Sequence, residues 1–137
     1  MGGAEIFTYE NAMRWVRAGH EVTLFTSKFP NCKTEQVVNG IRIVRDGGKF
    51  SVFWKAKACY KERFSKEGYD IIIDEINTRP FFAPKFVNEE KVIATIHQLA
   101  REYWFYETPF PMNYIGYYLE NGWLKNYISI PTITVSK

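Results

Sequence analysis

The chain has 137 residues, of which 46% are hydrophobic, and it carries 18 basic and 15 acidic side chains. This length predicts a single domain, and the apolar content excludes an intrinsically disordered chain. The formal net charge of +3 is too small to indicate a nucleic-acid-binding protein. No apolar run reaches the roughly 18 residues of a membrane span, and no secretory signal precedes the first predicted helix. We therefore expect a cytoplasmic protein.

The first part of the chain predicts a helix, a strand and a hairpin. The helix runs from residue 5 to 18, directly after Gly2-Gly3, and Gly19 ends it. A strand over 21–26 and a loop over 28–35 follow. A hairpin is predicted over 37–44, because Asn39-Gly40 suits a type I′ turn.

The rest of the chain alternates in the same way. We predict a basic helix over 50–66 ended by Gly68, and strands over 69–74, 91–95 and 132–135. A short helix is expected to start at 78–80, with Pro80 in its first turn. Residues 100–126 read as aromatic helices broken near 109–111. Near-continuous apolar strands are typical of a mostly parallel sheet with helices on both faces. The sequence therefore predicts an α/β fold whose first strand is missing, with no second domain.

The predicted helix over 50–66 has a basic face and an aromatic face. One interpretation is a helix that lies on a membrane surface and contacts anionic headgroups. The favoured interpretation is an ordinary surface helix with its aromatic stripe in the core and its lysines in water. The basic residues are Lys49, Lys55, Lys57, Lys61, Arg63 and Lys66, and the aromatic ones are Phe50, Phe53, Trp54, Tyr60 and Phe64.

The two cysteines, Cys32 and Cys59, have neither CxxC nor Cys/His spacing. Two buried free thiols are the favoured interpretation, and a disulfide or redox pair is the alternative. We expect no metal site and no cofactor.

Several segments together carry a family resemblance. They are GGAE before the first helix, GHEVTLFTS after it, IIIDEIN at 71–77, ATIHQL at 94–99 and PTITVS at 131–136. In order and spacing they resemble the N-terminal domain of a GT-B glycosyltransferase of family 4, over nearly the whole chain. The resemblance implies a Rossmann-like domain that binds the acceptor, facing a second domain that binds most of the nucleotide-sugar.

The glycine pair is the first candidate site. Glycine lets backbone N–H groups come close to a phosphate, and a helix N-terminus favours anions. By resemblance, Gly2 and Gly3 lie beside the donor diphosphate; a plain tight turn into the helix is the alternative. Glu5 either caps the helix, which is the favoured role, or faces the acceptor.

The second and third candidate sites follow predicted strands, at the sheet edge where open α/β sheets bind ligands. The resemblance gives His97 the role of positioning the donor sugar, and Gln98 can hydrogen-bond an acceptor hydroxyl. Asn77 suits sugar hydroxyls, and Arg79 suits a phosphate or carboxylate of the acceptor. The structural alternatives are a His97 bonded to a backbone carbonyl, an Asn77 that caps the next helix and a solvated Arg79.

Two further groups leave more than one interpretation. Asp74 and Glu75 suggest the carboxylate pair of a glycosidase, but neighbours on a strand face opposite ways, so we discount this. The aromatic residues at 103–106 and at 114, 117, 118 and 123 indicate core packing, with an acceptor wall or membrane contact as alternatives. Glu120 falls in a helix near the cleft by resemblance, and its role is open.

The resemblance implies a retaining transfer of a sugar from a nucleotide-sugar to a hydroxyl of a sugar or lipid-linked acceptor. Because the nucleotide-binding domain is not in this sequence, we expect the chain alone to bind donor poorly and to be inactive. A missing first strand exposes strand edges, which favours homodimerisation. The alternatives are a non-catalytic binding module or split-enzyme half that docks on a partner, and a peripheral membrane adaptor.

Overall fold

The computed structural model describes residues 2–77, 79–88, 90–99, 101 and 103–135. The chain divides into two compact units, Met1–Cys59 and Tyr60–Lys137. Within the described residues, no helix is both long enough and apolar enough to cross a bilayer.

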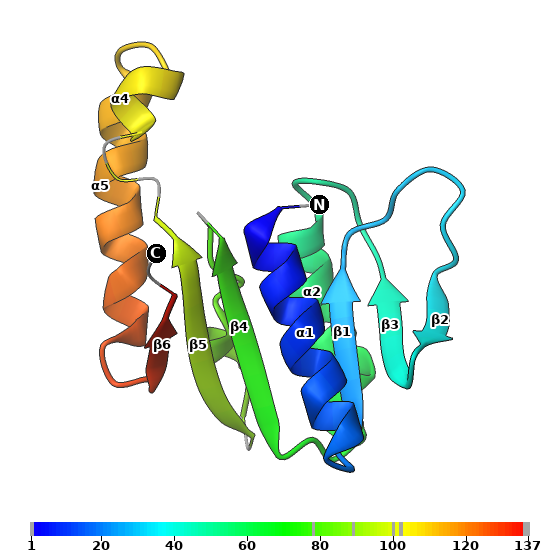
Figure 1. Cartoon of the computed structure of the whole chain (residues 1–137). Coiled ribbons are helices and arrows are strands. Elements are labelled where there is room, and N and C mark those ends of the chain that lie inside the picture. Colours follow the sequence, from blue (N-terminus) through cyan, green and yellow to red (C-terminus); the bar gives the residue numbers. More distant parts are fainter. Residues whose placement is uncertain (1, 78, 89, 100, 102, 136–137) are drawn as a thin grey trace. The chain divides into compact units, whose positions relative to one another are not determined.

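The first unit starts with helix α1 (Gly3–Arg17) and continues with strands β1 (Val22–Thr26), β2 (Glu35–Val38) and β3 (Ile41–Arg45). The strand order is β1-β3-β2 (Figure 1). Strand β3 pairs in parallel with β1 and antiparallel with β2. Gly19 ends α1 with a φ of 93°, as predicted for a residue after a helix C-terminus.

The predicted hairpin is confirmed. Asn39 and Gly40 have φ values of 51° and 82°, the pair of positive angles that a type I′ turn requires. The Asn39 amide donates to the Tyr9 hydroxyl at 2.6 Å. A Cβ on Gly40 would lie 2.7 Å from Cγ1 of Val16, so this turn also packs too closely on α1 for any side chain at residue 40.

The basic helix is shorter than predicted. Helix α2 covers Val52–Glu62, and a separate turn η1 covers Phe64–Lys66. Arg63 interrupts the helix with φ and ψ of −125° and −64°, which are not α-helical. Gly68, with a φ of 74°, follows η1 as expected for a stop signal.

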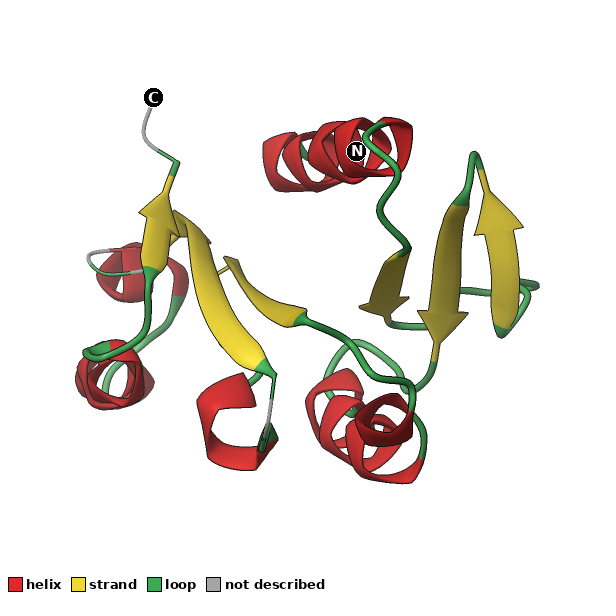
Figure 2. Cartoon of the chain, turned by 90° about the horizontal axis from the view of Figure 1, so that it is seen from below, coloured by secondary structure: helices red, strands yellow, loops and turns green. Residues whose placement is uncertain are grey.

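The second unit is built on strands β4 (Ile71–Asn77), β5 (Lys91–Gln98) and β6 (Thr132–Thr134). All three are parallel and lie in the order β4-β5-β6. Its helices are α3 (Ala83–Phe86), α4 (Tyr103–Glu107), α5 (Met112–Leu124) and the turn η2 (Lys125–Tyr127). Figure 2 shows helices packed beside this sheet. The buried residues Ile76, Ala94 and Tyr127 form the core.

Several strand bounds differ from the prediction: β1 and β4 begin at Val22 and Ile71 rather than at 21 and 69, and β6 ends at Thr134 rather than at 135. β4 continues to Asn77 and β5 to Gln98, because the ladder between them persists beyond Glu75↔Thr95 to Ile76↔Ile96. The short helix begins at Ala83 rather than at 78–80. Pro80 is fully buried before it, and Pro84 holds the first-turn position. Thr78 lies outside the described residues.

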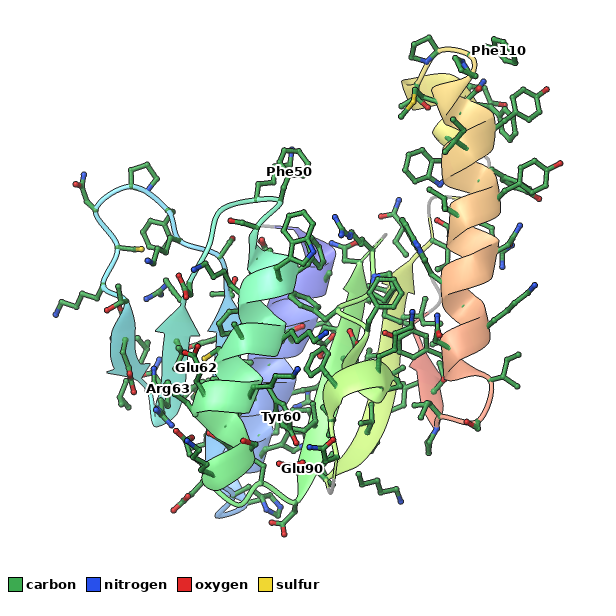
Figure 3. All side chains as sticks on the ribbon, turned by 180° about the vertical axis from the view of Figure 1, so that it is seen from behind. Phe50, Tyr60, Glu62, Arg63, Glu90 and Phe110 are labelled. Atoms are coloured by element: carbon green, nitrogen blue, oxygen red, sulfur yellow. The ribbon has the colours of Figure 1, made fainter. Side chains whose placement is uncertain are left out.

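The aromatic helices break near 109–111, as predicted, between α4 and α5. Trp104 packs on α5 so closely that a Cβ on Gly116 would lie 2.4 Å from its Cε3. Tyr106, Phe110 and Tyr118 are exposed (Phe110 is labelled in Figure 3). The block is therefore partly core and partly surface.

The predicted fold class, a Rossmann-like α/β arrangement with mostly parallel strands, is confirmed. No described strand precedes α1, and β1 and β4 each stand at one end of their sheets. Both cysteines are free thiols; Cys59 is buried, as predicted, while Cys32 is only half-buried.

Candidate functional site

Polar side chains gather where β4 and β5 end in the second unit. Asn77 and Gln98 are register partners and are both exposed. Arg79 forms an antiparallel bridge with Asn77. Because β4 and β5 are parallel, these residues share the carboxyl edge of the sheet, where open α/β sheets bind ligands.

His97 lies within β5 as the extra residue of a β-bulge. Ile76 pairs with Ile96, but the next residue of β4, Asn77, pairs with Gln98. One residue of β5 therefore has no partner on β4, and that residue is His97. Bulges of this kind turn a side chain to a new direction and are frequent beside active sites.

The His97 ring is held by a carboxylate from the neighbouring strand. Its Nε2 is hydrogen-bonded to Oε2 of Glu75. The His97 side chain is only 5% exposed and that of Glu75 28% exposed. A carboxylate partner at Nε2 keeps the proton on that nitrogen and fixes the orientation of the ring.

Asp74 serves a different part of the structure from its neighbour Glu75. Its carboxylate accepts the backbone N–H groups of Phe81 and Ala83, both at 3.1 Å, and the Tyr127 hydroxyl at 2.6 Å. Burial raises the pKa of Asp74, and these hydrogen bonds oppose the rise. Because Asp74 and Glu75 have separate partners, they form no pair of carboxylates around one bond, in agreement with the sequence argument.

Tyr127 completes the support of the segment after β4. Its hydroxyl oxygen accepts the N–H of Phe82 at 3.0 Å while its proton goes to Asp74. Burial and then the Asp74 carboxylate raise the pKa of Tyr127, so the phenol remains protonated at neutral pH. Phe82 has a φ of 63°, a left-handed conformation that is costly for a bulky residue. The three hydrogen bonds to the backbone of 81–83 hold this conformation and so fix the segment that follows Arg79.

Glu120 does the same for the segment after β5. It is 1% exposed, and its carboxylate accepts the backbone N–H of Arg101 at 2.9 Å and the indole N–H of Trp104 at 3.4 Å. The Arg101 guanidinium lies 3.7 Å from the same carboxylate and also donates to Asn121 at 2.7 Å. The sequence left the role of Glu120 open, and these contacts show that Glu120 positions the chain beyond Gln98.

Sequence reasoning missed three of these roles: Glu75 beside His97, Asp74 as a loop anchor, and Glu120 as a second anchor. Two signals were available. Asp74 is a charge inside an apolar strand, and Glu120 is an acid in an aromatic helix. Both patterns indicate a buried carboxylate that needs partners.

The remaining candidates, Gly2, Gly3 and Glu5, belong to the first unit. Glu5 caps α1, because its Oε2 accepts the N–H of Gly2 at 2.9 Å. Gly2 is the N-cap residue and has no side chain that could accept the N–H groups of the first turn. A Cβ on Gly2 or Gly3 would meet no described atom within 4 Å. Local packing therefore does not require glycine at either position.

Across the described residues, no three His, Cys, Asp or Glu side chains are grouped closely enough to hold a metal ion.

Comparison with known proteins gives one clear finding. The model of the family described as Glycosyltransferase Family 4 matches residues 1–129. No curated protein and no solved structure matches the chain. The match covers nearly the whole sequence and confirms the resemblance to the N-terminal domain of a GT-B glycosyltransferase. The chain belongs to glycosyltransferase family 4.

Proposed function

We propose that the chain supplies the acceptor side of a retaining glycosyltransferase, which moves a sugar from a nucleotide-sugar to a hydroxyl group. One observation carries this proposal beyond the family match. A nearly buried histidine, His97, is fixed by Glu75 at the carboxyl edge of two parallel strands, beside exposed amide side chains.

The acceptor oxygen bonds to the anomeric carbon, and the bond from that carbon to the diphosphate oxygen breaks. The acceptor O–H bond also breaks, and its proton passes to the leaving diphosphate or to water. Negative charge grows on the leaving diphosphate. The N-terminus of α1 carries a partial positive charge, and Gly2 and Gly3 leave room for a phosphate to approach its N–H groups.

The edge residues of the second unit suit the sugars. Asn77 and Gln98 each offer a hydrogen-bond donor and an acceptor, as sugar hydroxyls require. Arg79 suits an anionic group on the acceptor. His97, with its ring fixed, positions the donor sugar. Because Asp74 and Glu120 anchor the segments after β4 and β5, this edge is preorganised before any ligand arrives.

Ligand titration followed by amide NMR tests this proposal. Nucleotide-sugars and glycan acceptors are added to the purified chain at millimolar concentrations, since most of the donor affinity belongs to the second domain. We expect shifts of the Asn77 and Gln98 amides. The His97→Ala variant should bind roughly two- to tenfold more weakly, because it loses about one hydrogen bond to the ligand.

Two controls make the result specific. Lys91→Gln changes an exposed residue at the opposite end of β5 and should leave binding unchanged. The exposed His20 of the first unit provides a reference ring signal. If no nucleotide-sugar or acceptor shifts the amides of Asn77 and Gln98, or if His97→Ala binds as well as the parent chain, the proposed site is wrong.

A further inference from the structure

The aromatic hairpin formed by α4 and α5 leaves a large apolar surface in solvent. Figures 1 and 3 show that its far end extends past the ends of the strands of the second unit. The buried residues Gly116 and Glu120 of α5 lie on one side of that helix, which leaves the other side exposed. We name the exposed residues, each between 40% and 78% accessible, the hairpin surface: Phe105, Phe110, Met112, Tyr114, Ile115, Tyr118 and Leu119.

Ring contacts join the aromatic members of the hairpin surface into one patch. The Tyr114 ring packs edge to face on Phe105 and on Phe110, with 5.0 and 6.0 Å between ring centres. Tyr117 links Phe105 to Tyr118, at 5.5 and 5.7 Å. The exposed rings are therefore neighbours of one another, and are not single apolar residues scattered over the surface.

The aliphatic members extend this patch along α5, and none of it is charged. Met112, Ile115 and Leu119 are three and four residues apart, so they form a row on the helix. No charged residue occurs from 108 to 119. Glu120 follows directly, but it is only 1% exposed and its carboxylate faces the interior. A helix that is apolar on all sides is normally buried on all sides. The outer side of α5 therefore indicates a contact that one copy of the chain does not supply.

The size of the hairpin surface fits a protein interface. At about 150–250 Å² for each aromatic side chain, the exposed parts of its four rings amount to on the order of 450 Å². The three half-exposed aliphatic side chains bring this to roughly 600 Å². The largest apolar patch of a monomer is about 300–600 Å². A stable complex buries about 800 Å² on each partner, of which the polar rim is a part. The patch thus supplies most of the area that a stable dimer needs.

We propose that the hairpin surface binds the same surface of a second copy of this chain, which forms a two-fold symmetric dimer. This inference goes beyond the proposed transfer reaction and does not depend on it. A two-fold axis places a surface against itself, so that a charge near the axis meets a like charge. An uncharged surface avoids this repulsion, and it offers no ion pair to a charged partner, a nucleic acid or an anionic bilayer.

The helices determine how the two copies meet. Helix α5 has 13 residues and is therefore about 20 Å long. Two antiparallel copies of α5 can pack along this length, with the row of Ile115 and Leu119 in the centre. Tyrosine suits such a contact, because its ring is apolar and its hydroxyl can bind water at the rim. The dimer uses helices, and leaves the edges of β1 and β4 unpaired.

Sedimentation velocity with the purified chain tests the proposal. We expect a dimer with a micromolar or lower Kd, as found for interfaces of this size. The double variant Tyr118→Ser, Leu119→Ser removes two side chains of the hairpin surface. A residue at the centre of an interface contributes at least about 30-fold, and each substitution occurs twice in the dimer. The variant should therefore associate at least about 1000-fold more weakly and sediment as a monomer.

A matched control separates the hairpin surface from general surface hydrophobicity. Phe29→Ser with Ile128→Ser also removes two exposed apolar side chains, which are 58% and 83% accessible and lie outside the hairpin. This control should dimerise like the parent chain. In the parent chain and the control, the NMR ring signals of Tyr114 should shift as the protein concentration rises. Circular dichroism verifies that every variant is folded, as expected for exposed positions.

Four results would overturn the proposal. The first is a parent chain that stays monomeric at about 100-fold above micromolar concentration. The second is a dimer that persists in the double variant, because another surface would then form it. The third is an equal loss of association in the control. The fourth is binding of the hairpin surface to lipid vesicles without self-association.

Discussion

Replacing Tyr127 by phenylalanine tests the buried network below the candidate site. The change removes one oxygen and therefore two hydrogen bonds: the 2.6 Å bond to the Asp74 carboxylate and the 3.0 Å bond from the Phe82 N–H. A hydrogen bond to a charged group contributes about 1.5–3 kcal/mol and a neutral one about 0.5–1.5 kcal/mol. Tyr127→Phe should therefore lower the free energy of unfolding by about 2–4.5 kcal/mol.

The size of this loss should depend on pH. Burial raises the pKa of the Asp74 carboxyl above 3.8, so the folded state binds the Asp74 proton more tightly than the unfolded state does. The stability that comes from this proton is complete below pH 3.8 and is lost as pH rises through the folded-state pKa. The Tyr127 hydroxyl opposes the rise, and removing it raises the pKa of Asp74 further. The deficit of the variant should thus be smallest below about pH 4, where Asp74 is protonated in both states, and grow toward neutral pH.

Urea unfolding at several pH values measures the deficit, and hydrogen exchange at the Phe82 amide reports the local bond. Tyr118→Phe is a matched control because Tyr118 is exposed, and it should change stability by less than about 0.5 kcal/mol. A deficit of Tyr127→Phe as small as that of the control, or one independent of pH, would refute the reasoning.

Two further predictions concern packing and a loop. Gly116→Ala places a Cβ 2.4 Å from the Trp104 ring and should lower the free energy of unfolding in urea by about 1–3 kcal/mol. Gly122→Ala lies in open space on the same helix and should raise that free energy by about 0.5–1 kcal/mol. Equal effects of the two variants would contradict the packing described for α4 and α5. Arg45→Lys keeps the positive charge but removes the guanidinium group, whose Nη1 donates a hydrogen bond to the carbonyl of Lys33 at 3.0 Å. We expect faster proteolysis of the loop at residues 27–34 in this variant. An unchanged cleavage rate would show that the Arg45 guanidinium does not restrain the loop.

The elements that were predicted correctly depend on local chemistry. Asn39-Gly40 specifies its turn through the positive φ of both residues, and Gly19 and Gly68 end helices for the same reason. The strand ends were placed too early because polar residues at 75, 77 and 97 interrupt the apolar runs. Hydrogen bonding between β4 and β5 continues through these residues, and that pairing is a non-local property.

The sequence predicted where the candidate-site residues lie in the sheet, but it did not predict the contact between His97 and Glu75. His97 and Gln98 lie at the carboxyl edge as expected, because parallel strands of an α/β sheet end together. The contact between His97 and Glu75 spans 22 residues and depends on the register of two strands. Neither the bulge nor the register can be derived from one sequence, so the partner of His97 could not be predicted.

The bulge at His97 confines the register irregularity of β5 to the carboxyl edge of the sheet, beyond the strand pairs that form the core. Residues 91–96 keep an unbroken register with β4, and the irregularity begins only after Ile96. A single-residue insertion or deletion at this point would exchange the side chains presented to a ligand without moving Ile76 or Ala94. A length change at the end of β5 can thus alter which side chains stand at the carboxyl edge of the sheet, while the buried residues that stabilise the second unit remain the same.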